Sequence, residues 1–307
     1  MRFAAVDIGT NSARLLIAEE RDGALQEVAR VMRFTRLGQG VDVSGLLAED
    51  AIHRTLQVLA EYRELIRETA VTRVRATATS AARDAANSEV FFDAAERALG
   101  VRPELLRGAE EARLSFAGAT SGLGRARAPF FVFDVGGGST ELVLGESAPD
   151  VEMSLQLGCV RMTERHFRAD PPSDAEVRAC LSDVQRELNK APHLDVSAAR
   201  TVIGLAGTVT ALSGLQLGLQ RYDASRTHHS VLTAAQVEQL FERLRALTVE
   251  QRRAVLPEPE RATSILGGAA VVLGITRHFG VSEILVSEHD ILDGLVASLA
   301  RPPRFGS

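Results

Sequence analysis

The stretch Phe3-Ala-Ala-Val-Asp7-Ile-Gly9-Thr-Asn-Ser12-Ala-Arg14-Leu15 returns, 127 residues further along the chain, as Phe130-Phe-Val-Phe-Asp134-Val-Gly136-Gly-Gly-Ser139-Thr-Glu141-Leu142. Each copy reads as a strand, an aspartate, a turn of small polar residues and a second strand, which predicts a β-hairpin. Phe, Asp, Gly, Ser and Leu coincide in register, so we interpret the copies as an internal repeat. Two related lobes, each with one such hairpin, are therefore expected.

The pattern outside the repeat is typical of an α/β protein, because short apolar runs alternate with longer segments of helical periodicity. Before the second hairpin, the pattern predicts helices over Glu49–Thr69, Glu89–Leu99 and Glu110–Ala119 and a strand over Val71–Ala78. After it, helices are predicted over Asp174–Asn189, Ala234–Leu247, Arg261–His278 and Ile291–Ala300.

A length of 307 residues exceeds the size at which one hydrophobic core usually divides into two. The Gly-, Ser-, Arg- and Pro-rich segment Ser121–Pro129 is the expected linker. We therefore expect a first domain over residues 1–121 and a second over residues 122–307. The final helix is expected to pack back onto the first domain.

The net charge of −5 and the presence of a single lysine, Lys190, argue against a nucleic-acid coat. A polyanionic ligand would instead need a local group of arginines and backbone N–H groups. The two cysteines have no metal-binding spacing and are expected to be reduced. The longest apolar run, Ile265–Ile275, is too short to span a bilayer. These features predict a cytoplasmic protein with no membrane partner, and they leave a homodimer open.

The turns of the two hairpins are candidate phosphate-binding loops. Glycine and small hydroxyl residues leave consecutive backbone N–H groups unscreened, and such groups form a concave anion site. The candidates are Thr10, Asn11 and Ser12 in the first copy and Gly136, Gly137, Gly138, Ser139 and Thr140 in the second.

Carboxylates beside these loops would repel a phosphate unless a cation lay between them. Asp7, Asp134 and Glu141 are therefore candidate ligands of Mg²⁺ or Mn²⁺. Arg14 and Glu141 occupy equivalent positions with opposite charge, which suggests that the first loop holds phosphate and the second holds metal or water. A plain surface ion pair remains the alternative for these two residues.

A third glycine turn includes Gly207 and Thr208 and begins a predicted helix, whose N-terminus can bind a further phosphate. A P-loop is excluded as the phosphate site, because Lys190 does not lie in the Gly-x-x-x-x-Gly-Lys pattern.

Several motifs in order resemble the exopolyphosphatase and guanosine pentaphosphate phosphohydrolase (Ppx/GppA) family of the actin, Hsp70 and sugar kinase superfamily. Besides the two hairpins, the motifs are Arg36-Leu-Gly-Gln-Gly40, Thr77-Ala-Thr-Ser-Ala-Ala-Arg83-Asp-Ala-Ala-Asn87, Gly108-Ala-Glu-Glu-Ala-Arg113-Leu, Leu157-Gly-Cys-Val-Arg161 and Gly207-Thr-Val-Thr-Ala-Leu212.

The resemblance implies two ribonuclease H-like (actin-like ATPase) domains with an interdomain cleft and metal-dependent hydrolysis of a terminal phosphoanhydride. It maps the catalytic base to Glu111 and a phosphate contact to Arg83. Adjacent residues on a helix point about 100° apart, so Glu110 is expected to face structure or solvent. Helix capping is the alternative for both glutamates. The chain resembles the short members of the family, and Val286-Ser-Glu-His-Asp-Ile-Leu-Asp-Gly294 departs from the family's pattern between its serine and its glycine.

We expect an exopolyphosphatase that releases orthophosphate from inorganic polyphosphate. One alternative is a guanosine pentaphosphate 5′-phosphohydrolase with the same chemistry. Another, of a different class, is an actin- or Hsp70-like nucleotide-binding switch that hydrolyses slowly.

Overall fold

The computed structural model describes residues 1–191 and 194–300, which form two compact units. Unit 1 contains Met1–Gly118 and the C-terminal segment from His289, and unit 2 contains Ala119–Glu288. The segment from His289 belongs to unit 1, in agreement with the expectation that the final helix packs back onto the first domain, although the expected second domain ran over residues 122–307. The division lies within helix α5 and not in the linker Ser121–Pro129.

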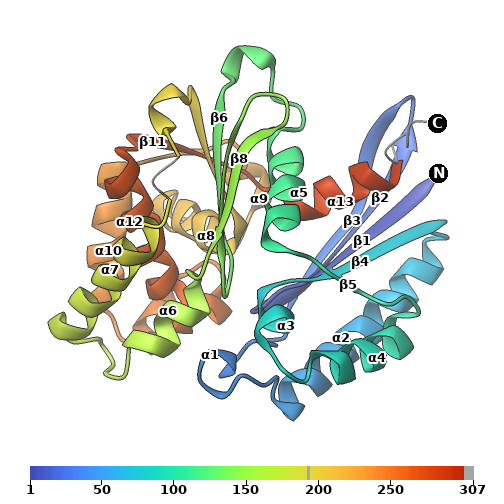
Figure 1. Cartoon of the computed structure of the whole chain (residues 1–307), viewed down its shortest axis with the longest axis horizontal. Helices are drawn as coiled ribbons and strands as arrows, with labels where there is room; N and C mark the ends of the chain where they lie inside the picture. Colours follow the sequence, from blue (N-terminus) through green and yellow to red (C-terminus); the bar gives the residue numbers. More distant parts are fainter. Residues whose placement is uncertain (192–193, 301–307) are drawn as a thin grey trace. The chain divides into compact units, whose positions relative to one another are not determined.

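Unit 1 is built on a five-stranded sheet in the order β3-β2-β1-β4-β5 (Figure 1). The first hairpin forms β1 and β2, and β4 and β5 continue the sheet in parallel with β1. The strands are β1 (Arg2–Ile8), β2 (Ser12–Arg21), β3 (Ala24–Phe34), β4 (Arg73–Ala78) and β5 (Glu104–Leu105). The helices are α1 (Val41–Ser44), α2 (Glu49–Glu68), α3 (Ser80–Asp84), α4 (Ser88–Leu99), α5 (Gly108–Thr120) and α13 (Ile291–Ala300).

Strand β1 is buried on both faces because helices cover both sides of the unit 1 sheet. Successive side chains of a strand point to opposite faces. Ala4, Val6 and Ile8 accordingly pack in the core under α2 and α4, whereas Phe3 and Ala5 pack with α13. The first hairpin turn therefore follows a strand that is anchored in apolar packing on both of its faces.

Unit 2 repeats this plan in a six-stranded sheet of order β10-β11-β9-β6-β7-β8. The second hairpin forms β6 and β7, and β9 lies parallel to β6, as β4 does to β1. The strands are β6 (Phe130–Val135), β7 (Thr140–Gly145), β8 (Pro149–Leu155), β9 (Thr201–Leu205), β10 (Val231–Thr233) and β11 (Glu283–Val286). The helices are α6 (Cys159–His166), α7 (Asp174–Leu188), α8 (Ala206–Gln216), α9 (Ala224–Thr227), α10 (Ala234–Arg245), α11 (Val249–Val255) and α12 (Ile265–Phe279).

Helix α12 is the central helix of unit 2, since its residues from Ile265 to Thr276 are all buried. The helix predicted over Arg261–His278 is wrong at its N-terminal end. Residues Pro259–Thr263 form a 3₁₀ turn, and α12 begins only at Ile265. Proline favours the first position of a helical turn, which explains the separate short segment.

Candidate active site

The first hairpin turn lies at the carboxyl end of β1. The N–H of Gly9 donates to the carbonyl of Ser12 at 2.9 Å, and Asp7 lies opposite Arg14 in the ladder. The loop between them is held by its carbonyls. Those of Asn11 and Thr10 accept hydrogen bonds from the backbone of residues 35, 36 and 38, the segment that follows β3.

The second hairpin has the same geometry, which confirms the internal repeat. Gly136 donates to the carbonyl of Ser139 at 3.0 Å, and Asp134 lies opposite Glu141. The carbonyl of Gly137 accepts from two residues at the start of α6 at 2.9 and 3.1 Å. The start of α6, which follows β8, therefore holds the second hairpin loop. The segment that follows β3 holds the first hairpin loop in the same way.

Close packing of Gly158 against the glycine loop explains why that position carries no side chain. A Cβ atom at Gly158 would lie 2.3 Å from the carbonyl oxygen of Gly137. The Nε of Arg161 also donates to the carbonyl of Gly138 at 2.6 Å. Arg161 is therefore a loop-holding residue in this structure.

The two loops keep backbone donors available for an anion. The N–H groups of Thr10, Asn11, Gly137 and Gly138 donate none of the loop or turn hydrogen bonds found among residues 1–191 and 194–300. Consecutive donors of this kind form an anion-binding concavity at the end of a hairpin. Both loops therefore have the chemistry that a phosphate group requires.

Asp7 and Arg14 form an ion pair at the base of the first loop. The Nη2 and Nε atoms of Arg14 lie 2.6 and 3.2 Å from Oδ2 of Asp7. Arg14 also contacts the carboxylate of Asp290, at the start of α13. The Arg14 guanidinium, which is predicted to bind phosphate, is thus held by two carboxylates. The sequence indicated neither ion pair.

The other carboxylate oxygen of Asp7, Oδ1, is buried and has no hydrogen-bond partner among the described residues. Burial raises the pKa of Asp7 above its ordinary value, against the opposing effect of Arg14. A buried acceptor without a partner requires a ligand or water to offset its desolvation. This atom is therefore a suitable ligand for a cation.

Glu111 and Arg83, the predicted base and phosphate contact, lie side by side in unit 1. Nη1 of Arg83 donates to Oε2 of Glu111 at 2.8 Å and to the carbonyl of Leu106 at 2.9 Å. Glu110 turns away and pairs with Arg75 at 3.1 Å, as expected from the rotation between helix neighbours. Of the two glutamates, Glu111 is the one beside the phosphate-contact candidate.

In unit 2, the metal candidates Asp134 and Glu141 lie on neighbouring strands, directly opposite each other. The side chain of Glu141 is buried and accepts a hydrogen bond from Oγ of Ser154 at 2.8 Å. No group of three or more His, Cys, Asp and Glu side chains that could hold a metal occurs within residues 1–191 and 194–300. A site with two carboxylates suits Mg²⁺, which is usually completed by water and substrate oxygens.

The third predicted loop, at the start of α8, lies beside the second hairpin because β9 runs parallel to β6. Gly207 faces the guanidinium of Arg261, and a Cβ atom at Gly207 would lie 2.0 Å from Nη1 of that arginine. Thr208 is only 4% exposed and packs against Gly268, so its hydroxyl is part of the core. Arg261, which the sequence did not indicate, thus brings to a helix N-terminus a guanidinium that is ion-paired with Glu258 at 2.6 Å.

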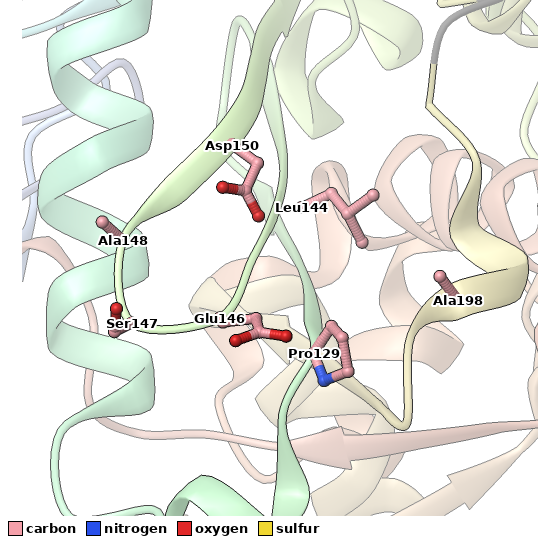
Figure 2. A pocket seen from close by; sticks show the side chains of 7 residues that line it. All are labelled: Pro129, Leu144, Glu146, Ser147, Ala148, Asp150 and Ala198. Carbon is pink, nitrogen blue, oxygen red and sulfur yellow. The ribbon is translucent and has the colours of Figure 1, made fainter.

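A pocket of about 300 Å³ lies at the opposite end of the second hairpin from Asp134 (Figure 2). It is lined by Pro129, Leu144, Glu146, Ser147, Ala148, Asp150 and Ala198. Two carboxylates and no basic side chain line it, so it is unsuited to a polyanion. The phosphate candidates therefore belong to the hairpin loops and not to this pocket.

The matched sheets, each an antiparallel hairpin extended by parallel strands, define a two-domain ribonuclease H-like, actin-like protein. The model of the Ppx/GppA phosphatase family matches residues 16–301, and the chain belongs to that family.

Similar proteins agree with this assignment. The chain is 46% identical to exopolyphosphatase 2 of Mycobacterium tuberculosis over 314 aligned residues, which cover 97% of this chain and 98% of that one. A crystal structure of an exopolyphosphatase-like protein superposes with a TM-score of 0.92 at 37% identity, covering 98% and 99% of the two chains. The Ppx/GppA family member from Aquifex aeolicus gives 0.82 at 35% identity, covering 98% and 97%.

Two further findings concern membrane-spanning helices and the state of the cysteines. Among the described residues, no helix combines the length and apolarity needed to cross a bilayer. Cys159 and Cys180 are both free and buried.

Proposed function

We propose that this protein is an exopolyphosphatase that removes the terminal phosphate of inorganic polyphosphate. The proposal is supported most strongly by the pairing of Glu111 with Arg83 at 2.8 Å, which joins a carboxylate base to a phosphate-binding guanidinium. Membership of the Ppx/GppA phosphatase family and likeness to a mycobacterial exopolyphosphatase support the same reaction.

In the proposed reaction, a water oxygen forms a bond to the terminal phosphorus while the bridging phosphoanhydride bond breaks. Glu111 orients this water and accepts its proton, and the shortened chain leaves with the bridging oxygen. Arg83 holds Glu111 and neutralises charge on the terminal phosphate. The products are orthophosphate and a polyphosphate that is one unit shorter.

The remaining phosphates are proposed to bind the hairpin loops. The backbone N–H groups of the loops, with Arg14 in unit 1 and Gly207 and Arg261 in unit 2, supply donors that suit phosphate oxygens. Ser12, Ser139, Thr140 and Thr208 are proposed to shape these loops.

Asp7 in unit 1 and, separately, the pair Asp134 and Glu141 in unit 2 are proposed as ligands of Mg²⁺ or Mn²⁺. The orphaned Oδ1 of Asp7 and the opposed pair of unit 2 carboxylates are the observations that fit a cation. When bound, such an ion neutralises charge on phosphate oxygens. A cytoplasmic location is also proposed, and the two free cysteines support a reducing compartment.

The decisive experiment compares Glu111→Gln with Glu110→Gln, its neighbour on α5. We expect Glu111→Gln to lower kcat for polyphosphate by roughly 10²–10⁴, the usual contribution of a positioned base. Glu110→Gln should retain activity within about threefold, because it breaks only an exposed pair with Arg75. Full activity of Glu111→Gln at the wild-type metal concentration would reject the proposed mechanism.

The substrate is tested by initial rates on long polyphosphate, short polyphosphate, guanosine pentaphosphate and ATP. We expect the highest kcat/KM with polyphosphate. A higher value with guanosine pentaphosphate would favour the alternative phosphohydrolase. Tight ATP or ADP binding with slow turnover of every substrate would favour a nucleotide switch.

A further inference from the structure

Asp290 occupies the position immediately before α13 and caps that helix. Its Oδ1 accepts a hydrogen bond from the N–H of Leu292 at 2.9 Å, and its own N–H donates to Oδ2 of Asp293 at 2.9 Å. The side chain of Asp290 thus caps the first turn of α13, and the carboxylate of Asp293 holds the backbone of the capping residue in return. Asp290 is 5% exposed, so its carboxylate has a defined place within unit 1.

The second oxygen of the same carboxylate contacts Arg14. Oδ2 of Asp290 accepts from Nη1 of Arg14, whose Nε and Nη2 are both directed at Asp7. The guanidinium is therefore held along two edges, by β1 on one side and by the start of α13 on the other. Two carboxylates on different edges fix the plane of the fork, which one carboxylate alone would not do.

The backbone of Asp290 is also fixed by the helix that carries the proposed base. A Cβ atom at Gly118 of α5 would lie 1.8 Å from the carbonyl oxygen of Asp290. One turn further along α13, a Cβ atom at Gly294 would lie 2.1 Å from the carbonyl oxygen of Leu114. The two helices thus approach backbone to backbone, and α5 sets where Asp290 stands.

We propose that Asp290 is a positioning residue that holds the Arg14 guanidinium ready for substrate phosphate. This inference rests on the proposed function, in which Arg14 binds the polyphosphate chain. An arginine side chain has many rotamers, and ordering it during binding would weaken affinity. Asp290 orders it beforehand, through a carboxylate 276 residues away in sequence.

The first test replaces Asp290 by residues that still cap a helix. Asp290→Ser keeps a capping oxygen and loses the reach to Arg14, whereas the single carboxamide oxygen of Asp290→Asn can accept from Leu292 or from Arg14 but not from both. We expect KM for polyphosphate to rise about tenfold in Asp290→Ser and less in Asp290→Asn, with kcat changed less than about twofold. The inhibition constant of orthophosphate should rise in parallel. A lower KM would mean that Asp290 competes with substrate for Arg14, and would overturn the proposal.

The matched control is Asp293→Asn, on the same turn of α13. Asp293 accepts from the N–H of Asp290 and pairs with Arg30 at 2.8 Å, and its hydrogen bonds and ion pairs within the described residues do not include Arg14. We expect this variant to lower the thermal midpoint and to leave KM unchanged. An increase in KM equal to that of Asp290→Ser would assign the effect to helix packing and overturn the proposal.

A double-mutant cycle with Arg14→Lys separates positioning from general loss of structure. Asp290→Ser should add less than about twofold to the KM of Arg14→Lys, because its partner is already altered. Additive increases would overturn the inference while leaving the proposed function intact. A wild-type KM in Arg14→Lys would remove Arg14 from the substrate site, and the inference with it. Failure of the wild-type enzyme to release phosphate from polyphosphate would overturn the proposed function itself and everything that rests on it.

Discussion

Arg83 spans the gap between the loop before α5 and the helix itself, because one of its nitrogens donates both to the carbonyl of Leu106 and to Oε2 of Glu111. The arginine thereby fixes the carboxylate relative to the sheet. A lysine has one ammonium group and lacks the planar fork, so it cannot reproduce this geometry while also binding phosphate.

We therefore expect Arg83→Lys to lower kcat/KM for polyphosphate by about tenfold to a hundredfold, with little change in thermal midpoint. Arg102→Lys is the control, because Arg102 is 41% exposed in its side chain and pairs with carboxylates on the surface of α4. Its kinetics should match those of the wild type. Equal effects of the two substitutions would show that Arg83 has no special place in the site.

Glu141 should determine how much metal the enzyme needs. Glu141→Gln keeps the hydrogen bond from Ser154 and removes the charge, so the Mg²⁺ concentration for half-maximal activity should rise about tenfold or more. Glu146→Gln makes the same change at the other end of the hairpin, in the acidic pocket, and should not alter it. An unchanged metal requirement in Glu141→Gln would remove Glu141 from the metal site.

Gly158→Ala tests the packing of the glycine loop. The added methyl group would meet the carbonyl of Gly137, and overpacking of this kind costs about 1–3 kcal/mol of unfolding free energy. We expect a lower thermal midpoint together with a higher KM, since the loop must shift. Gly124→Ala is the control: Gly124 has φ −69° and no atom within 4 Å of its Cβ position, so alanine should be neutral or stabilising. A Gly158→Ala enzyme with both properties unchanged would contradict the described packing.

Asp7 should make the protein less stable at neutral pH than its asparagine variant. Its pKa is raised by burial, so the folded state binds more protons than the unfolded state between the ordinary value of 3.8 and the raised one. Stability therefore falls as pH rises through that interval. We expect Asp7→Asn to have the higher thermal midpoint at pH 7, to lose this advantage at low pH, and to lose activity.

Glu176 has a lowered pKa, so its contribution to stability changes with pH in the direction opposite to that of Asp7. Backbone N–H groups of Ser173 and Arg168 lower its pKa to about 2, so its stabilisation is complete above 4.5 and is lost as pH falls through about 2. Glu176→Gln should therefore be less stable than the wild type at pH 7.

For Asp7, the contradicting outcome is a thermal midpoint of Asp7→Asn below that of the wild type at pH 7. It would show that the pair with Arg14 outweighs the burial of the carboxylate.

The hairpins were predictable because their information is local. The aspartate, the glycine and the serine of each copy follow one another within a few residues, and the structure confirms both expected hairpins. The two-domain α/β class followed from the repeat, since each hairpin needs its own sheet.

The sequence could not reveal contacts between distant segments. Asp290 reaches Arg14 across 276 residues, and Arg261 reaches Gly207 from a 3₁₀ turn where the sequence predicts the start of a longer helix. No spacing rule links such residues, because tertiary packing alone brings them together. The exposure of Thr208 was likewise not predictable, because it depends on Gly268 of another helix.

The return of α13 to unit 1 has a consequence for biosynthesis. Phe3, Ala5 and Leu16 form one apolar face of the first sheet, and Ile291 and Leu295 of α13 cover it. The ribosome must make the 170 residues of unit 2, Ala119–Glu288, before that cover emerges. At roughly 5–20 residues per second, this apolar face is without its covering helix for about ten to thirty seconds, the interval in which a chaperone would bind it.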